Sequence, residues 1–165
     1  MKIFKSGMKV LGIIALICVL TLSFSPSKAF AEGERILEVS GNAVMVDRDP
    51  GDAQTCNYEI LESIDLTEGQ SGTLLNFSEC CGDELRGELL LEASLEGDIF
   101  DVSSTAKLFE GRNCGGNDLE DQEGQRANVR DQELVPLKIS LENGGGLSGE
   151  NVDFDLQLRS ILPTR

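Results

Sequence analysis

The sequence predicts an all-β protein: an antiparallel β-sandwich of about eight strands, held by two disulfides. Three observations lead to this class. Apolar residues recur at every second position along most of the chain, short glycine- and aspartate-containing segments separate these stretches, and no segment carries the apolar stripe of an amphipathic helix. Many strands with short connections favour an immunoglobulin-like or jelly-roll sandwich over any α/β fold.

Four segments alternate clearly between apolar and polar side chains, which is typical of strands with one buried face. In the first, Leu89, Leu91 and Leu95 share one face and Glu92 lies on the other. These segments are residues 86–96, 99–109, 135–142 and 152–160. Weaker alternation predicts further strands at residues 35–39, 43–47, 57–66 and 72–78.

Turn signals lie between these strands. A turn is expected at residues 40–42, around Gly41, and a tight hairpin at residues 96–98. Residues 111–133 are polar and predict a long loop, and loops of that length in compact domains are usually functional or disordered. Residues 143–151 are rich in glycine and predict a flexible connector.

Four cysteines follow the N-terminal region, namely Cys56, Cys80, Cys81 and Cys114. An even number in an exported chain predicts two disulfides. A bond between the adjacent Cys80 and Cys81 would close a strained ring, so we expect Cys56 and Cys114 each to pair with one of them. The sequence leaves open which cysteine takes which partner.

Residues 1–31 have the features of a cleaved signal peptide. Lysines precede an apolar run at residues 10–22, which is short for a membrane span. Ala29 and Ala31 supply the small side chains that signal peptidase requires, so cleavage is expected just before Glu32.

Two alternatives to cleavage are an uncleaved membrane anchor and a lipoprotein modified at Cys18. The bulky Ile17 before that cysteine disfavours lipidation. Cleavage would leave residues 32–165 as one β-sandwich domain without a membrane span. Such a protein is expected to be secreted or periplasmic, in keeping with its cysteines.

The mature chain is strongly acidic. The whole sequence has 14 basic and 29 acidic residues, and loss of the signal peptide removes four lysines and no acidic residue, so the formal net charge changes from −15 to −19. This charge repels phosphate backbones, and the sequence holds no compensating basic patch. We therefore expect no nucleic-acid partner.

The densest group of oxygen-bearing side chains lies within residues 113–123. Its candidate ligands for a calcium ion are Asn117, Asp118, Asp121 and Glu123. Calcium takes six to eight oxygen ligands and accepts irregular loops, so this density favours a site. The residue order does not match the EF-hand pattern, and the alternative is a solvated acidic loop.

The whole chain contains no histidine, which excludes Ser-His-Asp and Cys-His catalysis and removes the commonest zinc ligand. The favoured hypothesis is a bacterial, non-catalytic binding or envelope-associated module that recognises an extracellular or envelope ligand. One alternative is a hydrolase that uses a pair of carboxylates. The other is a structural envelope protein or a protease inhibitor that presents the disulfide-held loop around Cys114.

Overall fold

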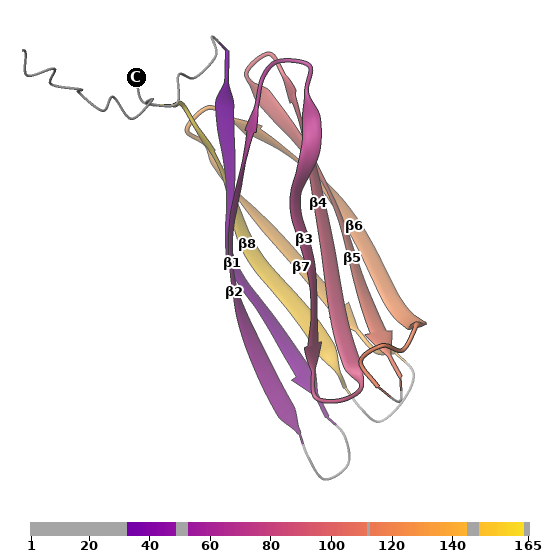
Figure 1. Cartoon of the computed structure of the whole chain (residues 1–165). Coiled ribbons are helices and arrows are strands. Elements are labelled where there is room, and N and C mark those ends of the chain that lie inside the picture. The colour runs from indigo at the N-terminus through magenta and orange to yellow at the C-terminus, as the bar shows by residue number, and fades with distance from the viewer. Residues whose placement is uncertain (1–32, 49–52, 112, 145–148, 164–165) are drawn as a thin grey trace, which may run out of the picture.

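A computed structural model describes residues 33–48, 53–111, 113–144 and 149–163. It confirms an all-β, antiparallel sandwich of eight strands (Figure 1). The strands are β1 (Arg35–Asp47), β2 (Gln54–Leu66), β3 (Ser71–Cys81), β4 (Leu85–Glu96), β5 (Ile99–Glu110), β6 (Asp118–Arg130), β7 (Leu134–Glu142) and β8 (Asn151–Ile161). One four-stranded sheet has the order β2-β1-β8-β7 and the other has the order β3-β4-β5-β6.

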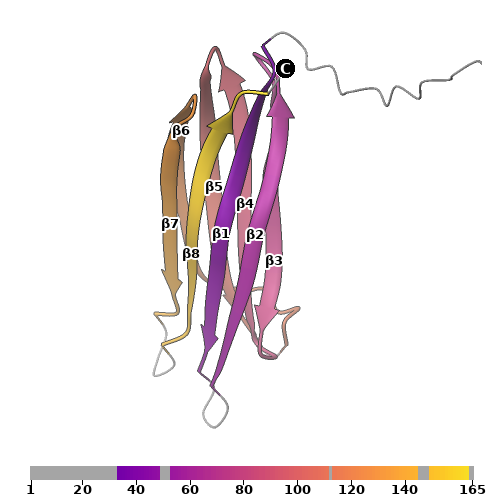
Figure 2. The ribbon, with the colours of Figure 1, turned by 90° about the vertical axis from the view of Figure 1, so that its left-hand side faces the viewer.

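Strands that follow one another in the chain are neighbours in space. Figure 2 shows β7, β8, β1 and β2 side by side, with β3 next to β2 at the edge of the sandwich. The first and last strands, β1 and β8, also pair with each other. This up-and-down order differs from the Greek-key order of immunoglobulin-like and jelly-roll domains, because each short connection reaches only the adjacent strand.

Two predictions from the sequence are wrong, one of a turn and one of a loop. The turn expected at residues 40–42 is instead the middle of β1, where Gly41 pairs with Ile60 of β2 and Leu156 of β8. The loop expected at residues 111–133 contains β6, which pairs with β5. The expected number of strands still agrees, because one strand was divided in two and another was missed.

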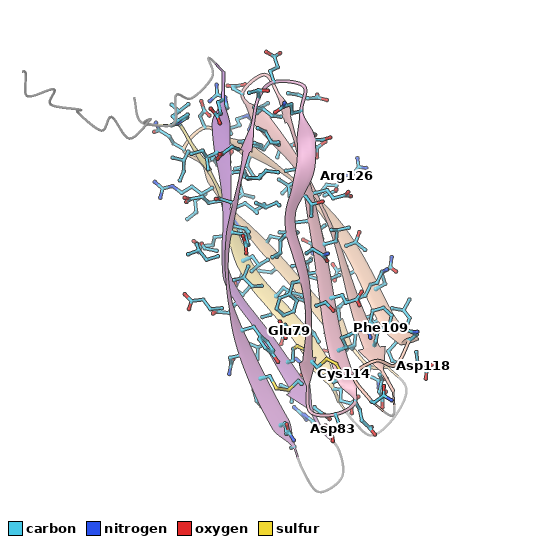
Figure 3. The ribbon with its side chains drawn as sticks, in the orientation of Figure 1. Glu79, Asp83, Phe109, Cys114, Asp118 and Arg126 are labelled. Carbon is cyan, nitrogen blue, oxygen red and sulfur yellow. A yellow bond between two sulfur atoms is a disulfide. The ribbon has the colours of Figure 1, made fainter. Side chains whose placement is uncertain are left out.

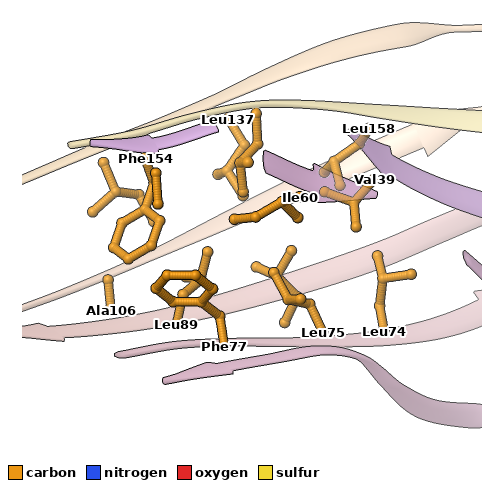
Figure 4. Packing of buried hydrophobic residues seen from close by; sticks show 14 of the residues in the cluster. Val39, Ile60, Leu74, Leu75, Phe77, Leu89, Ala106, Leu137, Phe154 and Leu158 are labelled. Carbon is orange, nitrogen blue, oxygen red and sulfur yellow. The ribbon is translucent and has the colours of Figure 1, made fainter. Parts of the chain in front are cut away.

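The inward-facing side chains of the two sheets form one apolar core (Figure 4). Phe100 and Phe154 are its largest fully buried side chains. Each large apolar side chain that is buried stabilises the fold by about 1.5–3 kcal/mol relative to its exposed state. The hairpin between β4 and β5 turns at Gly97, as the sequence predicts, and Pro136 lies in β7, an edge strand that tolerates a missing N–H.

The two disulfides join Cys56 to Cys81 and Cys80 to Cys114. Adjacent residues of a strand point to opposite sides of the sheet, which is why the neighbours Cys80 and Cys81 have different partners. Cys81 is fully buried and faces Cys56 of β2, whereas Cys80 bonds to Cys114 in the connection before β6 (Figure 3). The predicted signal peptide, residues 1–31, lies outside the described residues.

Candidate ligand-binding groove

The two sheets meet along two seams, and at each seam an edge strand of one sheet faces an edge strand of the other. The seam between β6 and β7 is bridged by side chains. Gln125 Nε2 donates a hydrogen bond to the carbonyl of Lys138 at 2.9 Å, and the Glu142 N–H donates to Asp121 Oδ2 at 3.1 Å. These bonds hold the sheets together on this side.

The seam between β2 and β3 is tied near its two ends. At one end residues 67–70 connect the strands, and the Gln70 N–H donates to the carbonyl of Thr67 at 3.0 Å. At the other end lie the Cys56–Cys81 disulfide and the hydrogen bond from the Tyr58 hydroxyl to the carbonyl of Cys80. Between these ties, in the described part of both strands, β2 and β3 do not pair with each other.

A groove of about 590 Å³ lies along this open seam, within the range of ordinary ligand sites. Its floor is apolar and is formed by Ile60, Leu75 and Phe77, each of them at most 9% exposed. Figure 4 shows Ile60 opposite Leu75 and Phe77. The other lining residues come from the two edge strands and are mostly polar: Glu59, Leu61, Glu62, Asn76, Ser78 and Glu79.

Two glutamates occupy positions of the inward-facing register beside this groove. On β2, Glu62 lies between the inward residues Ile60 and Ile64 but is itself exposed. On β3, Glu79 (Figure 3) likewise is exposed between two buried inward residues. Burying an unpaired carboxylate in an apolar core is strongly unfavourable, so the core does not close over these side chains and the seam stays open.

The floor of the groove is held by aromatic contacts. The ring of Phe77 contacts Tyr58 and Phe154 edge-on, with ring centroids 5.7 Å and 5.6 Å apart. Burial, and then the negative charge of Glu79, raise the pKa of the Tyr58 hydroxyl. The hydroxyl therefore stays protonated at neutral pH and keeps its bond to the Cys80 carbonyl.

The four predicted calcium ligands are dispersed. Asn117 and Asp118 are exposed at the start of β6. Asp121 accepts hydrogen bonds from the backbone N–H groups of Gln122 and Glu142, and Glu123 accepts one from the Gln125 side chain. Across the described residues no three Asp, Glu or Cys side chains form a metal-binding group, so calcium binding by these residues stays a prediction.

A smaller hollow of about 330 Å³ lies at the end of the sandwich that carries the disulfides. Its lining is acidic: Glu84, Glu110, Asp118 and Glu120, with Gly111. Burial raises the pKa of Glu110, the charges of Glu150 and Glu120 raise it further, and a hydrogen bond from Asn143 opposes them. This hollow has no apolar floor comparable to that of the groove.

Sequence reasoning did not single out Glu62 or Glu79. A signal for both was present, because each interrupts a row of apolar residues at every second position of its strand. Compared with known proteins, the chain matches no family model and no curated protein. The fold and the groove therefore carry the functional argument.

Proposed function

We propose that this protein is an exported, non-catalytic binding protein that holds its ligand in the groove between β2 and β3. One observation carries the proposal: an apolar floor lies along the seam where β2 and β3 do not pair and where exposed Glu62 and Glu79 occupy inward-facing positions, whereas side-chain hydrogen bonds bridge the opposite seam. The groove shares with ligand sites a concave shape and an apolar base, and its rim is mostly polar.

Export is supported by the two disulfides, which form and persist in oxidising compartments, and by the predicted signal peptide. Within the described residues, no helix has the length and apolar character needed to cross a membrane. The absence of histidine supports a non-catalytic role. Secretion and periplasmic retention are both compatible with these features.

The alternative functions would use sites other than the groove. A protease inhibitor would present the connection that holds Cys114, but the carbonyl of Cys114 accepts a hydrogen bond from Arg86 at 2.9 Å, and this guanidinium stacks on Phe109. The described part of the connection is thus held close to the sheet. A carboxylate-pair hydrolase would use the acidic hollow around Glu110.

Nuclear magnetic resonance of the ¹⁵N-labelled mature protein tests the proposal. We would titrate three classes of probe: mixed-sequence pentapeptides, oligosaccharides and medium-chain fatty acids. We expect at least one class to shift the amide signals of residues 59–62 and 75–79. The variant Glu79→Trp, which places a large ring at an inward-facing position of the groove lining, should lose these shifts while keeping its circular dichroism spectrum.

Two results would overturn the proposal. The first is that none of the three classes shifts the groove signals at millimolar concentration. The second is that Glu79→Trp responds as the unmodified protein does, because binding would then occur at another surface.

A further inference from the structure

We infer that the groove takes an extended, cationic segment of a partner protein, which adds as a strand to the free edge of β2. The inference rests on the proposed function and specifies its ligand. Three features of the groove lead to it: an unpaired strand edge, an apolar floor that matches alternate side chains, and carboxylates placed along the rim.

The edge of β2 is suited to strand addition. This strand pairs with β1 on one side only, so alternate residues direct their N–H and C=O groups away from the sheet. Its register with β1 is regular from Arg35↔Leu66 to Asp47↔Gln54. The register of β3 with β4 shifts between Thr73 and Leu75, at the start of its groove-lining residues, so the regular edge of β3 is shorter than that of β2. We therefore assign the added strand to β2.

The groove also matches the side-chain period of a strand. Successive side chains of an added strand point to opposite faces, so every second one would lie on the apolar floor formed by Ile60, Leu75 and Phe77. The intervening side chains would lie beside Leu61, which is 70% exposed on the outer face of β2. At about 3.3 Å per residue, four to five residues of a partner fill the lined length.

The negative charges of the groove favour a cationic partner. Glu59 and Glu62 line the groove from β2, and Glu79 lines it from β3. A purely apolar segment would cover these carboxylates without pairing them, which is unfavourable. Lysine or arginine side chains of an extended segment would instead reach them as exposed ion pairs.

The same charges disfavour a second copy of this chain. Pairing of two β2 edges would bring Glu59 and Glu62 of one copy against those of the other, and like charges on paired strands destabilise the pair. The formal net charge of −15 opposes self-association as well. Inward-pointing charges are a common way to prevent such edge-to-edge association.

Capped heptapeptides test the inference. Three peptides alternate valine with lysine, with glutamine or with glutamate, and their binding is measured by amide shifts and by fluorescence anisotropy at low and high salt. We expect the lysine peptide to bind most tightly and to lose affinity with added salt. Hydrogen exchange should slow at amides of residues 59–63 in β2 and not at those of residues 75–79 in β3.

Matched variants distinguish the effect of a carboxylate in the groove from the effect of the protein's net charge. Glu59→Gln should weaken binding of the lysine peptide about two- to fivefold, because Glu59 lies on the outer side of β2, where the lysines lie when the valines cover the floor. Glu142→Gln makes the same charge change at an exposed position on β7, the edge strand of the opposite seam, and should leave affinity unchanged.

The outcomes distinguish this inference from the proposed function. Equal binding of the glutamine peptide, or shifts caused only by oligosaccharides or fatty acids, would overturn the inference that the ligand is a cationic segment. The proposal that the groove binds a ligand would still hold. If no probe of any class shifts the groove signals, both proposals fall, and the glutamates serve only to protect the strand edges.

Discussion

Gly41 lies in the middle of β1 at a point where the neighbouring strand β8 allows no side chain. A Cβ at this position would overlap the carbonyl oxygen of Asp155 and lie 2.8 Å from the Cα of Leu156. The φ of Gly41, +151°, is also one that side chains rarely adopt. A glycine of this kind has the same sequence signature as a glycine in a turn, and this is why the sequence predicts a break in β1.

We expect Gly41→Ala to lower the free energy of unfolding by about 3 kcal/mol or more, because the backbone of two paired strands must shift. Urea denaturation would measure this. The control is Gly97→Ala, since Gly97 has a φ of +63° but no atom within 4 Å of its would-be Cβ, and it should cost about 1 kcal/mol. Equal effects of the two substitutions would show that close approach at Gly41 is unimportant.

Glu110 makes stability depend on pH. Because burial and neighbouring carboxylates raise its pKa above the usual 4.5, the folded protein keeps this proton to a higher pH than the unfolded chain does. The ionised carboxylate therefore reduces stability as pH rises through this interval and above it. Glutamine at this position has no such charge and can still accept the hydrogen bond from Asn143.

We expect Glu110→Gln to be more stable than the unmodified protein at pH 7 by less than about 1 kcal/mol, since solvent screens this partly exposed group. The difference should disappear as pH falls below 4.5, where the carboxyl is protonated in both states. Thermal melts between pH 3 and pH 8 would show it. Glu96→Gln, the same change at an exposed residue, controls for the loss of one negative charge.

Each disulfide joins β3 to another part of the sandwich. Cys56–Cys81 ties β2 to β3 across the seam that holds the groove, and Cys80–Cys114 ties β3 to the connection before β6. The two bonds span 25 and 34 residues of chain. In the chain-entropy description, loops of these lengths correspond to about 3–4 kcal/mol each.

We expect the double variant Cys56→Ala/Cys81→Ala to lose about 3–4 kcal/mol of stability and, in addition, affinity for the groove ligand, because one end of the groove is released. Cys80→Ala/Cys114→Ala should lose similar stability with little change in affinity. Urea unfolding and peptide mapping without reductant would check these expectations. Free thiols in untreated protein, or a Cys80–Cys81 linkage, would contradict the pairing.

Strands with apolar inward faces were predicted close to their observed bounds. The segment expected at residues 86–96 is β4, and β5, β7 and β8 agree similarly. Strand β6 was missed because its inward positions begin with Asp121, Glu123 and Gln125, whose partners include backbone groups of β7 in the other sheet. Alternation of polar with polar residues carries no periodic signal, so only the tertiary contact reveals this strand.

The groove could not be predicted for a related reason. It depends on which strands lie at sheet edges and on which two edges face each other, and neither is encoded in the alternation within one strand. The interruptions at Glu62 and Glu79 are visible in the sequence. Their meaning becomes apparent when β2 and β3 are seen on opposite walls of one seam.

At the scale of the whole molecule, the strands follow one another around the sandwich without a crossing. The sheets contribute the orders β2-β1-β8-β7 and β3-β4-β5-β6, and the seams bring β2 beside β3 and β6 beside β7. Within the sheets and across the seams, every neighbour of a strand is therefore its predecessor or its successor in the chain, apart from the pairing of β1 with β8. Contacts of this sequential kind favour rapid folding compared with Greek-key sandwiches.

Because β1 pairs with β8, the order of the strands is circular. A chain with the same strand neighbours could therefore begin and end at any of the connections between strands. Ile36 pairs with Ile161, so the two ends of the cycle lie side by side. A circular permutant that links these ends and opens the β4–β5 hairpin at Gly97 would keep every strand neighbour and both disulfides. We expect it to fold with the same disulfide map and to keep the groove, which peptide mapping and the lysine-peptide titration would measure.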